Sequence, residues 1–409
     1  MTRMTLATLL LISSLFAPCQ AAQLGTIRLD TSQEEPYQIL LDGQLSGLSI
    51  DVLDCIFQRL EQPHSIQLTS WKRAKQNVST HIAEGFFSSA PDAESDAFAQ
   101  LSAPLLIEKW YWYALDAQVL NRPPWDPQLR IGGVLGSNTL AWLETRGIHV
   151  QQKVPKLEQL IQLLQRGRID LILADQSAMD SASRDLNLQR QLQQRFVRYT
   201  PLGVYFSRAF LTQHPGFIQD FNEQVQNCAP ASSPLIALEQ QYLKQLVQLH
   251  LRRWGGQEVL FKALREAARQ PLSEAAIKRL DQQWMTEYLR RQQPFIDSVR
   301  QQPASVFLQG VHQQYQPLFN ELFLTDSRGV TAGMSRATSD YWQGDEAKFN
   351  IARTLPAEQL LIESIAYDGS TQSFQAQISA PLHDPGDGSL LGVLTFGVNI
   401  EAAFGDSQP

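Results

Sequence analysis

The apolar residues in the first half of the chain recur with two different spacings. In residues 48–60 they lie three and four positions apart, which predicts an amphipathic helix. Residues 171–174 form a continuous apolar run, typical of a strand buried in a parallel sheet. Such segments alternate across residues 24–228, which predicts an open, mostly parallel sheet with helices on both faces, repeated in two lobes. The other expected elements are strands at 25–30, 65–68 and 129–135 and a helix at 157–165.

The pattern changes after residue 228. Residues 229–234 read as a linker, and helical spacing then continues to about residue 293. Residues 322–334 and 373–399 each read as a β-hairpin, and a long helix followed by hairpins indicates a separate α+β module. The predicted fold class is therefore α/β, with three parts after the N-terminal segment. These are a two-lobed domain (22–231), a helical linker (232–271) and an α+β domain (272–405).

The N-terminus has the pattern of a secretory signal peptide over residues 1–21. A short cationic start at Arg3 precedes an apolar run at 6–16, and Cys19 and Ala21 stand at −3 and −1 of a cleavage site. The alternatives are an N-terminal membrane anchor, for which the run is short, and lipid attachment at Cys19, where Pro18 is unfavourable. No later segment is expected to span a membrane, so the expected location is the periplasm.

Composition narrows the classes of partner. The chain has 409 residues, 43% of them hydrophobic and 18% charged, with a formal net charge of −7. Nucleic acid and anionic lipid both require a concentrated basic surface, so neither is expected as a partner. The seven histidines are scattered singly, without the spacing of a metal site. No metal and no cofactor are predicted.

Two cysteines, Cys55 and Cys228, remain after removal of the signal peptide. In an oxidising compartment they could form one disulfide. Two buried free thiols are the alternative, and the sequence leaves both open.

A series of short motifs in residues 24–228 occurs in a recognisable order. Each motif is weak alone, but the order extends over some 200 residues. The motifs are Pro36-Tyr37, GLSIDV at 47–52, WKRA at 71–74, SAP at 102–104, GSNT at 136–139 and GRID at 167–170, which leads to Asp175. This part of the chain resembles the type 2 periplasmic binding fold of extracellular solute-binding protein family 3. The resemblance implies two lobes that close over a solute like a hinged clamp.

The resemblance also implies where a solute would bind. Family members that bind amino acids hold the carboxylate with an arginine, and that position falls on Ser95 here, so a simple amino acid is not the expected ligand. The aromatic runs at 86–87 and 110–113 instead favour cations, rings or sugars, unless their alternate members pack in the core. Residues 137–139 could present N–H groups to an anion or could simply cap a helix, and Asp175 ends a buried strand, where ligands bind in α/β sheets. The candidate ligand-binding residues are Tyr37, Trp71, Phe87, Ser102, Trp110, Ser137, Asn138, Thr139 and Asp175.

Residues 272–405 resemble a single Cache domain, an extracellular sensory relative of the PAS fold. The resemblance rests on LFLTDSRG at 322–329, ATSDYWQGDEAKF at 337–349, YDGS at 367–370 and the strand at 392–399. It implies a small-molecule pocket beside the central sheet, with aromatic walls and carboxylate acceptors. The alternative is that the acidic residues cap helices and pin the loop around an empty pocket. The candidate ligand-binding residues here are Tyr341, Trp342, Asp345, Glu346, Tyr367 and Asp368.

Enzymatic function is not expected. Glu363-Ser364 looks like the acid of a lytic transglycosylase, but it precedes strand-forming residues and lacks the accompanying groove motif. No nucleophile elbow, P-loop or dinucleotide fingerprint occurs.

The function predicted from these features is that of a sensor. A solute would close the first domain, and the second would pass that state to a membrane-embedded signalling protein. The first alternative is the substrate-binding subunit of an ABC transporter, which delivers solute to a permease. The second is a ligand-free interaction adaptor.

Overall fold

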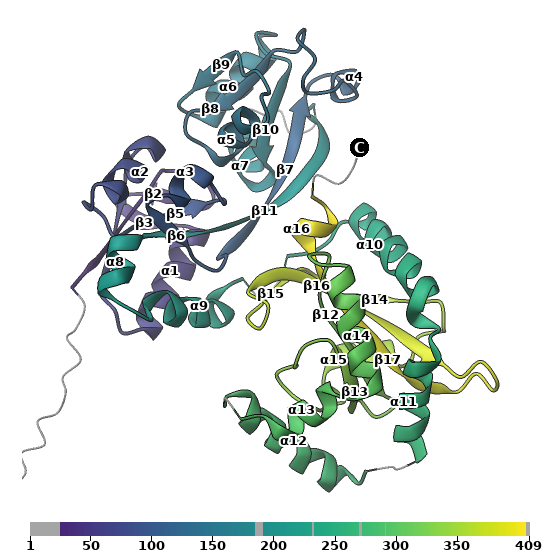
Figure 1. Ribbon diagram of the computed structural model, residues 1–409. Coiled ribbons are helices and arrows are strands. Elements are labelled where there is room, and N and C mark those ends of the chain that lie inside the picture. Colours follow the sequence, from purple (N-terminus) through teal and green to yellow (C-terminus); the bar gives the residue numbers. More distant parts are fainter. Residues whose placement is uncertain (1–24, 185–190, 231–232, 270–271, 291, 406–409) are drawn as a thin grey trace, which may run out of the picture.

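The computed structural model describes residues 25–184, 191–230, 233–269, 272–290 and 292–405 (Figure 1). The predicted signal peptide lies outside the described residues. Two α/β lobes are joined by long strands, and a separate α+β domain lies against those strands. This arrangement confirms the predicted fold class.

The first lobe contains a parallel sheet. Strand β1 (Ile27–Thr31) lies between β4 (His64–Leu68) and β5 (Gly85–Ser89), and both pairings are parallel. Helix α1 (Leu48–Arg59) buries the apolar side chains whose spacing predicted it. Helix α9 (Phe217–Cys228) packs beside α1. The remaining elements of this lobe are β2 (Ile39–Leu41), β3 (Gln44–Ser46), α2 (Trp71–Ser79), α3 (Ala93–Asp96), β6 (Ala99–Leu101) and α8 (Arg208–Gln213).

The second lobe repeats the parallel arrangement. Strand β8 (Ile131–Val134) lies between β9 (Gln152–Val154) and β10 (Leu171–Asp175), again with parallel pairing. The apolar run expected to form a buried strand is β10, and all five of its residues are buried. Its helices are α4 (Ala117–Leu120), α5 (Asn138–Thr145), α6 (Leu157–Gln165) and α7 (Gln176–Arg184).

Two antiparallel strands, here called the hinge strands, connect the lobes. Strand β7 (Leu106–Ala114) pairs with β11 (Gln193–Ser207) and, on its other side, with β10. The end of β11 continues into the first lobe and pairs with β5 and β6. The strand β11 therefore runs from one lobe to the other, as Figure 1 shows.

The C-terminal domain is built on an antiparallel sheet of six strands, in the order β13-β12-β17-β16-β14 with β15 also paired to β16. Both predicted hairpins are present, as β12 with β13 and as β16 with β17. The strands are β12 (Phe319–Asp326), β13 (Thr331–Met334), β14 (Leu361–Ile362), β15 (Ala366–Asp368), β16 (Ser373–His383) and β17 (Leu390–Asn399).

The segment expected as a helical linker (232–271) is helical over Ala237–His250 and Glu258–Arg269, and these helices pack into the C-terminal domain. Leu243, Val247, Leu260 and Leu264 are buried in the same core as the sheet residues of the C-terminal domain. The apolar stripe of these helices is covered by the sheet, so the segment forms one layer of that domain. The helices of this domain are α10 (Ala237–His250), a π-helical turn (Leu251–Gly255), α11 (Glu258–Arg269), α12 (Glu274–Tyr288), α13 (Pro294–Arg300), α14 (Pro303–Gln314), α15 (Ala347–Ala352) and α16 (Ile400–Ala403).

The C-terminal domain contacts the hinge strands directly. The ring of Phe404, just after α16, lies against Phe196 and Tyr199 of β11, with centroids 5.6 and 5.4 Å apart. On the same strand, Arg198 forms an ion pair of 2.9 Å with Glu401. Lys109 Nζ of β7 lies 3.3 Å from the carboxylate of Glu239 on α10. Both hinge strands are therefore in contact with the second domain.

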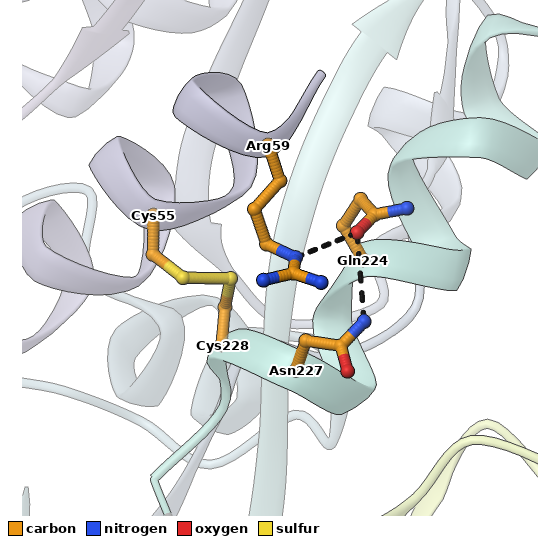
Figure 2. Close-up of a disulfide and its surroundings, with 5 residues drawn as sticks. All are labelled: Cys55, Arg59, Gln224, Asn227 and Cys228. Atoms are coloured by element: carbon orange, nitrogen blue, oxygen red, sulfur yellow. Dashed lines mark hydrogen bonds between the residues drawn. A yellow bond between two sulfur atoms is a disulfide. The ribbon is translucent and has the colours of Figure 1, made fainter. Parts of the chain in front are cut away.

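A disulfide joins Cys55 of α1 to Cys228 at the end of α9 (Figure 2). Beside it, Arg59 Nε donates a hydrogen bond of 2.9 Å to Gln224 Oε1, so the two helices are linked twice. The disulfide lies at the point where the chain leaves the first lobe for the C-terminal domain. In the described part of the chain, no helix has the length and apolar character needed to cross a membrane.

Candidate functional site

A cavity of about 280 Å³ lies between the two lobes. The first lobe contributes the loop after β1 and the start of α2. The second lobe contributes the carboxyl ends of β8 and β10 and the starts of α5 and α6, and β7 contributes Glu108. Carboxyl ends of parallel strands are where ligands enter open α/β sheets, so the topology places the cavity where a solute would bind.

The lobes are in contact across this cavity. The hydroxyl of Tyr37 in the first lobe donates a hydrogen bond of 2.8 Å to Asp175 Oδ2 in the second. Asn138, in the first turn of α5, donates to the carbonyl of Ser88 at 2.9 Å and accepts from the N–H of Ala90 at 3.1 Å. These bonds join the two lobes directly beside the cavity.

The lobes also approach each other closely at Gly136. This residue has φ +78°, and a Cβ atom there would lie 2.8 Å from the Cβ of Trp71 in the other lobe. A side chain at this position would therefore both strain the backbone and keep the lobes apart.

Five carboxylates line the cavity. Glu35 and Glu158 are exposed, and the other three, Glu34, Glu108 and Asp175, are more buried. Asp175 is saturated, since it accepts from the backbone N–H groups of Lys109 at 2.9 Å and Ala178 at 3.0 Å as well as from Tyr37. Glu108 Oε2 accepts a bond of 2.6 Å from Trp110 Nε1. The Asp175 carboxyl group is therefore held in place by three donors, whereas Glu108 has one oxygen available.

The environment raises the pKa of Glu34, Glu108 and Asp175. Burial, and then the nearby charge of Asp175, raises the pKa of Glu34 to about 7. The same two causes, followed by the charge of Glu34, raise the pKa of Glu108 well above its ordinary value. Burial is also the main reason why the pKa of Asp175 is raised. The cavity is thus an acidic site, in which carboxyl groups outnumber the one basic side chain of the described lining, Lys156.

Five of the predicted residues meet at this cavity. Trp71, Ser137, Asn138, Thr139 and Asp175 all line it, although they come from separate parts of the chain. The hydroxyl of Ser137 caps α5 by accepting from the N–H of Leu140 at 3.2 Å, so the helix-cap alternative describes its role here. Tyr37 does not line the cavity itself, but its hydroxyl donates a hydrogen bond to Asp175, which does.

The structure corrects three of the predicted residues. Phe87 and Trp110 are 0% and 1% exposed and lie in hydrophobic cores, not on the cavity wall. In the run 110–113 the side chains alternate between two cores on opposite faces of β7, because a strand directs successive side chains to opposite sides. Ser102 is tied to the hinge, since its Oγ accepts from the N–H of Val204 at 3.0 Å and donates to the carbonyl of Ala103 at 2.7 Å.

Sequence reasoning missed Glu34 and Glu108. Glu108 carried a detectable signal, because Glu108 and the adjacent Lys109 are the charged residues of a strand that otherwise consists of apolar and aromatic residues. Glu34 lies in the polar loop after β1 and has no distinguishing local pattern.

A second, more open hollow of about 1250 Å³ lies on the C-terminal domain. Its floor is the face of the sheet that carries Glu321, Gln375 and Gln377, and part of its wall is helix α9 of the first domain. The two domains also touch at its edge, where the side chain of Gln226 accepts a hydrogen bond from the N–H of Gly369. This hollow is therefore lined by both domains.

A polar network covers the floor of the second hollow. Glu321 Oε1 accepts from the amides of Gln375 at 2.8 Å and Gln377 at 3.0 Å. Lys348 Nζ donates to Gln377 Oε1 at 2.7 Å. Burial and the charge of Asp368 raise the pKa of Glu321 to about 7. The floor is thus ordered by its own side chains.

Three of the six residues predicted in this domain line the hollow, namely Glu346, Tyr367 and Asp368. Asp368 also caps a turn, with Oδ1 accepting from the N–H of Ser370 at 2.7 Å. The strand residues Glu321, Gln375 and Gln377 were missed, although polar residues two positions apart in an apolar strand are the signal of a polar face.

The other three are corrected. Tyr341 packs in a core with Trp284 and Phe295. Trp342 Nε1 donates to the carbonyl of Arg328 at 2.9 Å, and Asp345 is exposed outside the hollow. The motif at 339–346 therefore serves mainly to hold its own loop. Its aromatic side chains are used to pack on α12 and the β12–β13 turn.

No family profile matches the chain, and no curated protein matches it. Among solved structures, about half of the chain is similar to two-lobed binding domains. One is an ABC uptake transporter substrate-binding protein from Streptococcus pneumoniae with bound histidine, with 13% identity, a TM-score of 0.42, and coverage of 49% of this chain and 87% of that one. Another is a histidine kinase sensor domain similar to periplasmic binding proteins, with 14% identity, a TM-score of 0.42, and coverage of 50% and 90%. A third is the GluR0 ligand-binding core in complex with L-glutamate, with 15% identity, a TM-score of 0.43, and coverage of 50% and 92%.

The arrangement of the first domain defines its class. Two parallel α/β lobes, joined by antiparallel crossing strands and with a cavity between them, make residues 25–228 a periplasmic-binding-protein-like fold.

Proposed function

We propose that this protein is a periplasmic sensor that binds a small molecule between its lobes and relays the bound state to a membrane-embedded signalling protein. The observation that carries the proposal is the inter-lobe cavity, across which Tyr37 contacts Asp175 and Asn138 contacts Ser88 and Ala90. A solute in this position would bind the closed state more tightly than the open one. Differential affinity of this kind is what shifts the equilibrium between the two states.

Contacts between the C-terminal domain and the hinge strands support relay. Opening of the lobes requires β7 and β11 to bend or twist, and α10 and α16 are attached to those strands through Lys109–Glu239 and Arg198–Glu401. The C-terminal domain would then experience a change when the clamp opens. In this proposal the C-terminal domain is a Cache-like module, and the first domain is a member of solute-binding protein family 3.

The polar hollow of the C-terminal domain is proposed as a second ligand site. Glu346, Tyr367, Asp368 and Glu321 would present acceptors there to an amine or hydroxyl group. A ligand in this hollow would also contact α9 of the first domain, so its binding would depend on how the two domains are placed.

Capture of partner proteins from detergent-solubilised membranes tests whether the protein contacts a membrane signalling protein. The mature chain, immobilised with and without a stabilising ligand, should retain a membrane signalling protein in one state only. Recovery of a transporter permease in place of a signalling protein would support the alternative, the substrate-binding subunit of an ABC transporter. If no metabolite raises the melting temperature of the full chain, binding fails and the ligand-free adaptor becomes the preferred function.

A further inference from the structure

The inter-lobe cavity carries information about the chemistry of its ligand, and the inference drawn from it rests on the proposed binding function. We propose that the cavity binds a small organic cation, an amine or quaternary ammonium compound without a carboxylate, through Glu108, Glu34 and the face of Trp71.

One carboxylate oxygen of Glu108 is available to a ligand. Glu108 is 3% exposed as a residue and lines the cavity. Its Oε2 accepts from Trp110 Nε1, whereas Oε1 accepts no hydrogen bond from the described residues and is accessible from the cavity. A charged donor from a ligand is the strongest partner that this oxygen could gain.

Acidic side chains outnumber basic ones around the cavity. Glu34, Glu108 and Asp175 line the cavity, and Lys156 is the one basic side chain among its described lining residues. Lys156 is exposed at the start of α6. Lys109, although adjacent to Glu108, directs its ammonium group away to Glu239. A cation would therefore enter a carboxyl-rich site, where its charge favours the ionised form of these groups and the exposed Lys156 is the one described basic side chain that could compete.

The residue that would bind the carboxylate of an amino acid ligand is not an arginine in this chain. The position at which an arginine was expected, Ser95, is fully buried, and its hydroxyl donates to Asp92 at 2.6 Å. Asp92 is paired in turn with Lys75 at 2.6 Å, outside the cavity lining. A zwitterionic amino acid would thus bring its carboxylate next to three acidic groups, without a guanidinium to receive it.

Size and aromatic surface complete the assignment. A cavity of about 280 Å³ is slightly below the range of roughly 300–1,000 Å³ that is usual for small-molecule pockets, so the ligand must be small. Trp71 lines the same cavity, and an indole face attracts cations through its quadrupole.

The test is isothermal titration and thermal unfolding of the full mature chain with putrescine, agmatine and choline, against L-glutamate and glucose. We expect at least one amine to raise the melting temperature, and Glu108→Gln to weaken its binding about tenfold or more, the loss expected for one charge-assisted hydrogen bond. Glu34→Gln should also weaken binding, and it keeps the test usable if the buried Glu108 variant does not fold. Glu144→Gln, on the outer surface of α5 and paired with Lys153, should bind like the wild type.

Several results would overturn the assignment. Stabilisation by glutamate or glucose but not by the amines would refute the cationic class, while the proposed clamp would stand. Amine binding that is unchanged in both glutamine variants would place the cation elsewhere. If none of the amines binds, the cation assignment fails. If, in addition, a broad metabolite library leaves the melting temperature unchanged, the proposed binding function fails as well.

Discussion

At the scale of single residues, the cavity is lined by carboxyl groups whose ionised forms are unfavourable in that environment. Glu34, Glu108 and Asp175 bring like charges together in a partly desolvated space, which disfavours their ionisation. Such an arrangement lowers the stability of the ligand-free closed state at neutral pH. Sites of this kind are where binding functions are commonly found.

The first prediction concerns pH. The pKa of Glu34 is raised from 4.5 to about 7, so the folded protein holds a proton that the unfolded chain releases. The resulting stabilisation is fully present below pH 4.5 and is lost as the pH rises through about 7. The free energy of unfolding is measured in urea at about pH 5 and about pH 8. The increase from pH 8 to pH 5 should be larger for the wild type than for Glu34→Gln. Parallel pH profiles for the two proteins would contradict this prediction.

The second prediction concerns the contact between lobes at Asn138. Asn138→Ala removes two inter-lobe hydrogen bonds, each contributing about 0.5–1.5 kcal/mol, and should favour the open state. Small-angle X-ray scattering of the ligand-free protein should then give a larger radius of gyration. Asn121→Ala, at the exposed end of α4, is the control and should leave the scattering unchanged. An unchanged radius in both variants would mean that these bonds do not hold the lobes together.

At the scale of elements, α1 and α9 link the start and the end of the first domain. The disulfide between Cys55 and Cys228 spans 173 residues in sequence, and the helices also share the Arg59–Gln224 hydrogen bond. Because α9 is followed by the segment that leads to the C-terminal domain, this pair of helices fixes where the second domain begins.

The third prediction follows from this link. Replacing both cysteines, Cys55→Ser with Cys228→Ser, should lower the free energy of unfolding by about 2–5 kcal/mol, since a cross-link over a long loop restricts the unfolded chain. Denaturant unfolding of oxidised wild type, reduced wild type and the double variant measures this effect. The reduced wild type should resemble the variant. Equal stability of all three would show that the disulfide adds nothing.

At the scale of the whole molecule, the C-terminal domain is attached to the hinge strands of the first domain. Phe404 packs between β11 and α10, with its ring also 5.0 Å from that of Tyr242. Phe404 is 7% exposed, whereas the carboxylate side of the Arg198–Glu401 pair is 40% exposed, so the apolar contact contributes more than the ion pair. Typical contributions are about 3–5 kcal/mol for a buried phenylalanine and about 1 kcal/mol or less for an exposed ion pair.

The fourth prediction is that Phe404→Ala loosens this attachment. Hydrogen exchange in the first half of β11 should become faster, because that strand loses its cover from α16. Phe349→Ala removes a buried ring elsewhere in the C-terminal domain and is the matched control. If both variants change exchange in β11 equally, Phe404 acts only through general stability.

Sequence patterns predicted the elements well and the cavity in part. The helix at 48–60, the strand at 171–174 and both hairpins were found because their spacing is a local property. Trp71, Ser137, Asn138, Thr139 and Asp175 line the cavity, and they were selected because they lie at element ends, where open sheets bind ligands. Their role in ligand binding stays a prediction. Phe87, Trp110 and Tyr341 were misplaced, since an aromatic residue has the same local pattern in a core as on a cavity wall.

What the sequence by itself determined is a series of local helices and strands, and an α/β part followed by an α+β part. These depend on periodicity within a few turns of chain. Only the tertiary structure decided that Glu34, Glu108 and Asp175 share one cavity, that Cys55 meets Cys228, and that the supposed linker is a layer of the second domain. Such contacts join residues far apart in the chain. They depend on strand order, lobe closure and domain packing, which no local pattern encodes.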